Sequence, residues 1–367
     1  MVIGKMDSGG KKNLVMEYYR HIDRDKIQFD FICDSDSQAI PVDEIKSLGG
    51  RVYIIPPYQN IIANMHEMKK ICKENNYLVM HAWNSTMNIF PMKVAKSLGI
   101  PVRISESLSM AHEGDWKTKI KKILKPMSKM YATHYMSCGE DCGRWQFGNE
   151  LFDAGKVDVF KTVINTKYND FDSDLREKTR KEFGWEDKIV VGHIGRFTPQ
   201  KNSIHLIEIF AAIARKEPRA VLCLIGDGEL KEEMFKKIEE LGIKDQVNYL
   251  GRREDIQQFY NAMDCFLLPS LYEGLPVVGL EAESCGLPMF FSTEVTEEAN
   301  ACELGHFISL SESEDVWADE ILYAIKNNIS IRRSHAKEVA AAGFDSESES
   351  KRLQQYYIDA IKKQEVK

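Results

Sequence analysis

The sequence predicts an α/β protein built from two doubly wound domains, on three observations. Short apolar runs alternate with amphipathic helical stretches along most of the chain, which is typical of parallel strands joined by crossover helices. The alternation starts twice, near the N-terminus and again at residue 188. The length of 367 residues also exceeds what one small core organises.

In the first half, apolar runs predict strands and the amphipathic stretches between them predict helices. The strands are expected at 29–34, 51–56, 77–82, 101–105, 133–138 and 160–164, and the helices around 11–21, 60–75, 86–98, 116–130 and 139–147. The opening MVIGKMDSGG predicts the last part of a strand, either very short or truncated, that runs into a glycine loop.

The second half predicts another series of buried strands, followed by helices only. The strands are expected at 188–195, 220–226, 246–251, 264–269 and 287–292. The polar, apolar-poor segment 165–174 predicts the boundary between the domains, after residue 167. From about Ser311 the chain predicts helices, and the last, around 348–363, carries apolar side chains that need a surface to cover.

Composition excludes several classes of protein. With 43% hydrophobic and 29% charged residues and a net charge of −7, the chain is an ordinary soluble type and not a generally basic nucleic-acid binder. No signal peptide is visible, and no apolar run approaches the roughly 20 residues of a spanning helix. The eight cysteines form no CxxC pair, which favours reduced thiols in a cytosolic protein. Cys138 and Cys142 lack a second ligand pair for zinc.

The segment from Ser270 to Pro288 carries the strongest chemical pattern. A predicted strand ends in a turn that holds Glu273, and a helix then begins near Pro276, with Glu281 eight positions after the first glutamate. Ligands of doubly wound sheets bind beyond the carboxyl ends of strands. The first amides of such a helix can donate to an anionic or hydroxylated ligand, and each carboxylate can accept from a pair of sugar hydroxyls. A surface turn with solvated glutamates is the structural alternative.

A second pattern, GHIGRFTPQKN, follows the strand at 188–195. It delivers Gly195 and Arg196 to the strand end and places Lys201 at the start of the next helix, with Asn202 as the expected N-cap. The planar fork of arginine and the compact charge of lysine both suit a diphosphate. A solvent-facing basic loop is the alternative.

Three weaker patterns fit the same ligand. LIGDGEL has Gly226 and Gly228 in a tight strand-to-helix turn that predicts a close backbone approach to the ligand. LGRRED places two arginines, Arg252 and Arg253, where a nucleotide base can rest, although ordinary surface arginines fit equally well. The opening Ser8-Gly9-Gly10 loop can offer N–H groups to phosphates.

With these motifs, the chain resembles glycosyltransferase family 4 over nearly its whole length, and looks closest to the bacterial branch that builds capsular and exopolysaccharides. The resemblance implies the GT-B fold, in which two Rossmann-like domains face each other across a cleft and the final helix crosses back onto the first domain. The expected domains are therefore an acceptor-side domain, 1–167 with 349–367, and a donor-binding domain, 168–348.

The resemblance also implies residue roles at matching positions. The Glu-x7-Glu signature matches Glu273, which would hold the donor sugar, and Glu281, which would hold the ribose. Arg196 and Lys201 match the basic residues for the diphosphate. The remaining donor-binding residues expected from motif and resemblance together are Gly10, Gly195, Gly228, Arg253, Gly274, Leu275 and Pro276. The family is retaining and usually needs no metal or other cofactor.

The chain departs from the family pattern on the acceptor side. A histidine-containing stretch is expected after PVRIS, but the sequence continues with Glu106 at roughly that place, and His112 is the nearest downstream imidazole. We therefore assign Glu106 to the catalytic set and His112 to the acceptor side. His81, at a strand end, is expected either to contact the acceptor or to be a satisfied structural histidine. Lys11 and Lys12 after the glycine loop add positive charge beside the diphosphate, or form a solvated helix start.

Residues 115–130 carry six lysines with an apolar stripe between them, which is the profile of an interfacial helix. The hypothesis is peripheral contact with the inner face of the plasma membrane, and a solvated helix whose stripe packs in the core is the alternative.

For function, the leading prediction is retaining, metal-independent transfer of a sugar from a nucleotide diphosphate sugar, UDP by preference, to a glycan or lipid-linked acceptor. The alternatives are a non-catalytic partner subunit and a GT-B sugar-nucleotide epimerase.

Overall fold

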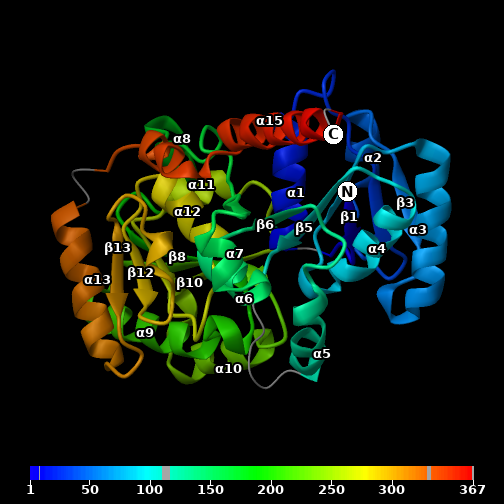
Figure 1. Ribbon diagram of the computed structural model, residues 1–367. Coiled ribbons are helices and arrows are strands. Elements are labelled where there is room, and N and C mark those ends of the chain that lie inside the picture. Colours follow the sequence, from blue (N-terminus) through cyan, green and yellow to red (C-terminus); the bar gives the residue numbers. More distant parts are fainter. Residues whose placement is uncertain (8, 110–115, 329–331, 366–367) are drawn as a thin grey trace. The chain divides into compact units, whose positions relative to one another are not determined.

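The computed structural model describes residues 1–7, 9–109, 116–328 and 332–365 (Figure 1). The chain divides into two compact units. Unit 1 comprises Met1–Val163 and Ser346–Lys367, and unit 2 comprises Ile164–Asp345. The boundaries predicted from the sequence lie within a few residues of these.

Unit 1 is built on a seven-stranded parallel sheet in the order β3-β2-β1-β4-β5-β6-β7. Its strands are β1 Val2–Gly4, β2 Phe31–Asp34, β3 Val52–Ile55, β4 Val79–Ala82, β5 Val102–Ser107, β6 His134–Ser137 and β7 Val157–Val159. Its helices are α1 Gly10–His21, α2 Val42–Ser47, α3 Ile61–Asn75, α4 Ile89–Ser97, α5 Trp116–Leu124, α6 Glu140–Phe147, α7 Asn149–Asp153 and α15 Ser346–Glu365.

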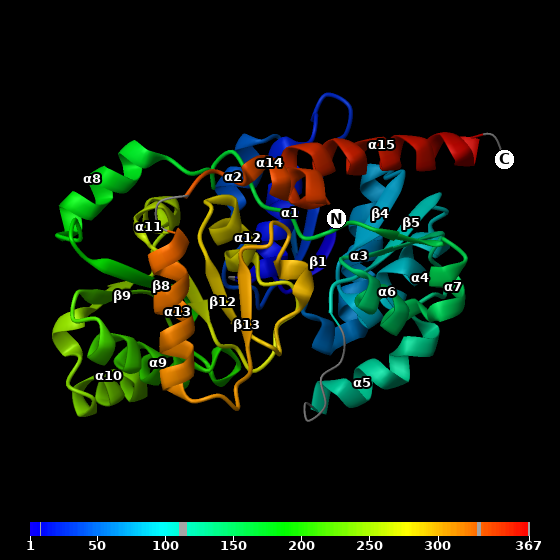
Figure 2. The same ribbon diagram turned by 90° about the vertical axis from the view of Figure 1, so that its left-hand side faces the viewer.

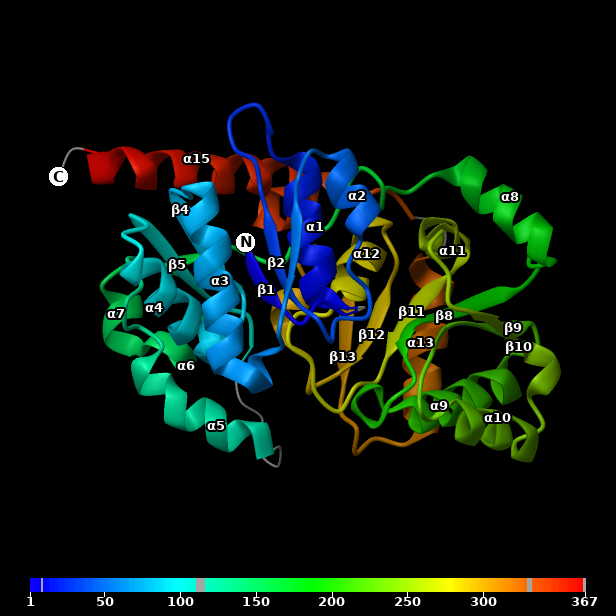
Figure 3. The same cartoon turned by 90° about the vertical axis from the view of Figure 1, so that its right-hand side faces the viewer.

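Alternate residues of the strands build two cores, one on each face of this sheet. Ile3 and Phe31 point to the face covered by α1 and α15, where Tyr357 of the last helix is buried. Val2 and Ile32 point to the opposite face, which is covered by α3 and α4 (Figure 3). The final helix therefore packs on the first domain, as expected, and uses its apolar side chains to do so.

Unit 2 has a six-stranded parallel sheet in the order β10-β9-β8-β11-β12-β13. Its strands are β8 Ile189–Arg196, β9 Ala220–Asp227, β10 Val247–Gly251, β11 Cys265–Leu268, β12 Met289–Ser292 and β13 Gly305–Ile308. Its helices are α8 Ser173–Phe183, α9 Ser203–Lys216, α10 Lys231–Glu240, α11 Ile256–Ala262, α12 Val277–Ser284, α13 Glu314–Asn328 and α14 Ala336–Val339.

Helices cover both faces of this second sheet as well. One core joins it to α9, α10 and α13 (Figure 2), and the other joins it to α11 and α12. Strand order reverses at β8, which pairs with β9 on one side and with β11 on the other. In doubly wound sheets the loops beyond the carboxyl ends of strands at such a reversal form the ligand site.

Most predicted strands are confirmed to within two residues, with one clear exception. The run at 160–164 is not a strand: β7 lies earlier, at Val157–Val159, and Ile164 forms only an isolated bridge with Asp345. Phe160 and Val163 belong to a connecting segment that is buried in the core of unit 1. Their apolar side chains therefore gave the same sequence pattern as a buried strand. All eight cysteines lie in the described part of the chain and are free thiols.

Candidate functional site

The strongest candidate site lies at the strand reversal of unit 2, in the loops that follow β8 and β11. β8 ends at Arg196, which is exposed, and the chain then makes a 3₁₀ turn at Pro199–Lys201 before α9 begins. Asn202 occupies the N-cap position but makes no side-chain capping bond, because its backbone is left-handed there (φ 53°). The capping bond predicted for Asn202 is therefore wrong, although the helix begins where expected.

Glu273, in the loop after β11, reaches back to the loop after β8. Its Oε1 lies 2.6 Å from Lys201 Nζ, and the two side chains are only 9% and 12% exposed. The Ser270 hydroxyl donates to the same oxygen at 2.8 Å, and Gln200 Nε2 donates to Oε2 at 3.4 Å. Lys201 and Glu273, which are far apart in the sequence, therefore form a sheltered, charge-assisted ion pair.

The backbone holds the two loops together beneath this pair. The amide of Leu271 donates to the carbonyl of Gln200 at 2.8 Å, and the Ser292 hydroxyl, at the end of β12, donates to the carbonyl of Ser270. The first of these hydrogen bonds fixes the loop that carries Lys201 relative to the loop that carries Glu273, and the second ties the latter loop to β12.

Glu281 lies about one turn into α12. Its Oε2 accepts a hydrogen bond of 2.8 Å from the hydroxyl of Tyr260 on α11, and the Tyr260 ring is fully buried. Burial, with the negative charge of Glu281, raises the pKa of Tyr260 well above its usual value. The tyrosine therefore stays a neutral donor that fixes one carboxylate oxygen of Glu281.

The turn between the two glutamates leads directly into α12. Gly274 and Leu275 lie in that turn and Pro276 is the N-cap residue, before the helix begins at Val277. The first amides of a helix have no partners within it. The turn and the helix start therefore present N–H groups at the edge that also carries Glu273.

The glycines at the end of β9 pack against the backbone at the end of β8. A methyl group added to Gly226 would lie 1.8 Å from the carbonyl oxygen of Gly195, and one added to Gly228 would lie 2.3 Å from that of Phe197. These close backbone contacts are to the end of β8 and the residue that follows it. These glycines let two loops of the site pack against each other.

The arginines after β10 are engaged with acidic neighbours. Arg253 forms a bidentate pair with Asp255, with Nε 2.8 Å from Oδ1, and its guanidinium lies over the ring of Phe259. Arg252 lies 3.6 Å from Asp227, at the end of β9. Both stay at the same edge of the sheet, although neither contacts the pair of Lys201 and Glu273.

In unit 1, the lysine that follows the glycine loop is tied to the sheet. Gly10 begins α1, and nothing lies within 4 Å of a methyl group placed on it. Lys11 Nζ donates to the carbonyl of Ile3 at 2.6 Å and to Asn84 Oδ1 at 3.3 Å, and burial lowers the pKa of Lys11. Lys11 is therefore not a solvated helix start.

His81 and Glu106 lie in the core of unit 1, each 1% exposed. His81 Nε2 is 2.7 Å from Glu106 Oε2, and His81 Nδ1 is 2.7 Å from the hydroxyl of Tyr357 on α15. With each side chain 1% exposed, little of either is available for contact with a substrate. This placement argues against a catalytic role for Glu106 and an acceptor contact for His81, and it matches the structural alternative. His112 lies outside the described residues.

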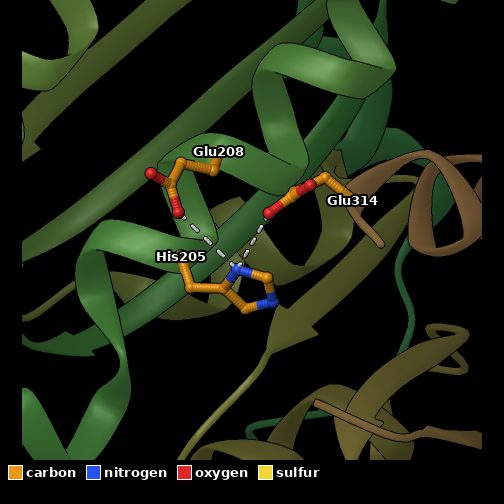
Figure 4. A group of neighbouring side chains, drawn as sticks. All are labelled: His205, Glu208 and Glu314. Atoms are coloured by element: carbon orange, nitrogen blue, oxygen red, sulfur yellow. Dashed lines mark ion pairs between the residues drawn. The ribbon is translucent and has the colours of Figure 1, made fainter. Parts of the chain in front are cut away.

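One cluster in the described part of unit 2 has the composition of a metal site (Figure 4). Its members are His205 and Glu208 on α9 and Glu314 at the start of α13, and both carboxylates lie 3.7 Å from His205 Nδ1. One imidazole and two carboxylates suit a divalent transition ion. Lys237 Nζ, 3.0 Å from Glu208, already supplies a positive charge. None of the three side chains belongs to the cluster of Lys201 and Glu273.

Sequence reasoning missed three contributors to the site. They are Gln200, Tyr260 and the hydroxyl of Ser270, which hold the two glutamates in place. Ser270 lies within the segment singled out from the sequence, and its spacing of three residues from Glu273 was a usable signal. The partner of Glu281 is 21 positions away and appears only when α11 and α12 are packed side by side.

The fold is that of a GT-B protein, and the candidate ligand site lies at the strand reversal of its second unit. Residues 175–342 match the family model of glycosyl transferases group 1. The sequence is similar to the putative glycosyltransferase EpsF of Bacillus subtilis, with 30% identity over 94% of this chain and 92% of that protein. The chain belongs to the group 1 glycosyltransferases, which confirms the resemblance drawn from its motifs.

Two further comparisons extend over the whole chain. The UDP-Gal:alpha-D-GlcNAc-diphosphoundecaprenol alpha-1,3-galactosyltransferase of Escherichia coli is 24% identical over 96% of this chain and 94% of that enzyme. The crystal structure of Anabaena Alr3699/HepE in complex with UDP has a TM-score of 0.73 and 19% identity, over 98% of this chain and 100% of that one. That structural likeness concerns the fold.

Proposed function

We propose that this glycosyltransferase moves a sugar from a UDP-sugar to a glycan or lipid-linked acceptor in bacterial cell-surface polysaccharide synthesis, with retention of the anomeric configuration and without a metal ion. The observation that carries the proposal is the sheltered Lys201–Glu273 pair beside the helix start of α12. The galactosyltransferase relative takes UDP-Gal and a diphosphoundecaprenol acceptor by its name, and the HepE structure holds UDP, which supports this choice of donor and acceptor.

The two glutamates take different parts of the donor in this proposal. Glu281, whose second oxygen is held by Tyr260, accepts from the ribose hydroxyls. Glu273 accepts from hydroxyls of the sugar, with Ser270 fixing its Oε1. The amides of Gly274 and Leu275 donate to the sugar or phosphate oxygens at the start of α12.

Lys201 and Arg196 stabilise the departing diphosphate. In a front-face substitution the bond to the leaving group breaks while an acceptor hydroxyl attacks from the same side, so negative charge grows on the diphosphate oxygens. Positioned cations and amides in a sheltered site stabilise that charge most strongly in the transition state. This side-chain set takes the place that a divalent ion has in metal-dependent transfer.

Release of UDP from donor sugars tests this function. The purified chain should release nucleoside diphosphate from at least one UDP-sugar, and an excess of EDTA should not lower the rate. Glu281→Ala should raise the KM for the donor about tenfold or more, because a charged hydrogen-bond acceptor for the ribose is lost. Unchanged kinetics in this variant would contradict the ribose role. UDP binding without any turnover would favour the non-catalytic partner subunit.

A lipid-linked acceptor implies work at the inner face of the plasma membrane, and we propose a peripheral location there, on the cytoplasmic side. In the described part of the chain, no helix has the length and apolar character to cross a bilayer. Helix α5 offers an interfacial surface instead, because Lys119 and Lys122 are exposed and Ile123 is 69% exposed beside them. An exposed apolar side chain flanked by lysines suits an anionic lipid surface.

Vesicle sedimentation checks this contact. The protein should sediment with vesicles that contain anionic lipid at low ionic strength, and be released at high salt, since Lys-lipid attraction is screened. The double variant Lys119→Glu/Lys122→Glu should stay in the supernatant. Lys69→Glu/Lys70→Glu, which changes two exposed lysines of α3, serves as the control and should sediment like the parent. Equal loss in both variants would contradict a specific role for α5.

A further inference from the structure

A buried histidine lies directly under the proposed donor site and is not explained by the core alone. His193 is in β8, two residues before Gly195, and is 0% exposed. Its Nδ1 lies 2.9 Å from the carbonyl oxygen of Leu267 in β11, and its ring is stacked against Phe266 with an angle of 11° between the planes. The imidazole is thus held on one side by the sheet.

The bond to Leu267 fixes the state of the ring. A carbonyl only accepts, so Nδ1 carries the proton and donates, which leaves a lone pair on Nε2. Burial lowers the pKa of His193 to about 4, so the ring is neutral at physiological pH. Within the described residues Nε2 has no hydrogen-bond partner, so a buried acceptor is left unused beside the candidate site.

This lone pair faces the loop that carries Lys201. A methyl group built on Gly195 would lie 3.1 Å from His193 Nε2 and 3.8 Å from Lys201 Cε. The edge of the imidazole and the stem of the lysine therefore flank the same side of Gly195. The positive charge of Lys201 also contributes to the low pKa of His193, after burial, as expected when the two groups are neighbours.

We propose that His193 is a positioning residue for Lys201, with Nε2 accepting a hydrogen bond from the ammonium group. An ammonium has three protons to donate. In the structure one is directed to Glu273; in the proposal a rotation of the lysine side chain directs a second to His193, and the third is left for a diphosphate oxygen. When the diphosphate competes with Glu273 for this ammonium, the imidazole keeps the lysine over the site.

The inference rests on the proposed function for its ligand, and two matched substitutions separate the two ring nitrogens. His193→Asn keeps a donor near Nδ1 for the Leu267 carbonyl and removes the acceptor at Nε2. His193→Gln keeps an acceptor near Nε2 and loses the donor at Nδ1. In calorimetric titrations with UDP, we expect the His193→Asn variant to bind about tenfold more weakly than the parent. The His193→Gln variant should retain most of the affinity. The reverse order would mean that only the bond to Leu267 matters, and would overturn the proposal.

A double-mutant cycle with Lys201→Met shows whether His193 acts through the lysine. The tenfold loss caused by His193→Asn should disappear in the Lys201→Met background, whereas a merely structural loss would persist there. The same four proteins are also unfolded thermally without nucleotide, and the two Tm changes should be non-additive. Additive changes would overturn the inference even if UDP binds normally. If the parent does not bind UDP while the Tm changes are non-additive, the proposed function fails and the contact between the two residues stands.

Discussion

Replacing Lys201 by methionine should lower the rate of sugar transfer by about 10²–10³-fold, which is the usual effect of removing one group that stabilises developing negative charge in a sheltered site. The ammonium of Lys201 lies 2.6 Å from Glu273, and Arg196 is the second positive side chain assigned to the diphosphate. The loss should appear mainly in kcat, because the charge on the diphosphate is greatest in the transition state. Steady-state kinetics with the preferred UDP-sugar measure it.

A stability control separates catalysis from folding. The single variant leaves the Glu273 carboxylate 9% exposed without its cation, which should lower the free energy of unfolding by about 2 kcal/mol. The double variant Lys201→Met/Glu273→Gln removes both charges and should recover most of that stability, since the glutamine can still accept from Ser270. It should not recover activity. If activity returned together with stability, Lys201 would have only a structural role.

Replacing Glu106 by alanine should destabilise the protein by about 2–3 kcal/mol, because it leaves the buried Nε2 of His81 without its partner. The carboxyl is 1% exposed and lies 2.7 Å from His81, which in turn lies 2.7 Å from the hydroxyl of Tyr357. This chain of contacts ties α15 to the centre of the sheet in unit 1. Chemical denaturation of Glu106→Ala measures the loss, and Glu74→Ala, at an exposed position of α3, is the control.

Glu106→Gln should be as stable as the parent at pH 7, or more stable. Burial raises the pKa of Glu106 and lowers that of His81, so we infer a neutral pair in which the carboxyl donates to His81 Nε2. The side-chain amide of the glutamine variant can donate to the same nitrogen. A carboxyl with a raised folded pKa contributes its full stability only below its unfolded pKa and loses it as pH rises towards the folded value. The advantage of the glutamine variant should therefore grow as the pH rises above that unfolded value. A glutamine variant as unstable as the alanine variant at pH 7 would contradict the neutral pair.

The arrangement of the loops that carry the candidate donor residues was largely predictable because its signals are local. The strand, the turn and the helix that carry Glu273 and Glu281 follow one another within twenty residues, and the loop with Arg196 and Lys201 follows the next strand in the sheet. The strand reversal at β8 and β11 then brings these two loops together. The sequence did not reveal which atoms meet, since the bonds of Tyr260 and Gln200 depend on packing between separate segments.

The acceptor side was harder to predict because the burial of a side chain depends on segments that are distant in the sequence. Glu106 follows an apolar strand and was expected at the reacting centre, but β5 extends to Ser107 and carries the carboxyl into the core. His81 ends β4 in the same way. Their shared partner, Tyr357, comes from a helix 276 positions beyond His81. Pairing between such distant residues leaves no periodic pattern, so the structural reading of His81 needed the fold.

The central claim is that Lys201, Glu273 and Glu281 form the binding site for the donor. A crystal structure of the protein with UDP tests it most directly. We predict the ribose hydroxyls within hydrogen-bond distance of Glu281 and the diphosphate within that distance of Lys201 Nζ, beside Arg196. UDP bound elsewhere, with the Lys201–Glu273 pair unchanged and Glu281 without contact to the ribose, would contradict the account.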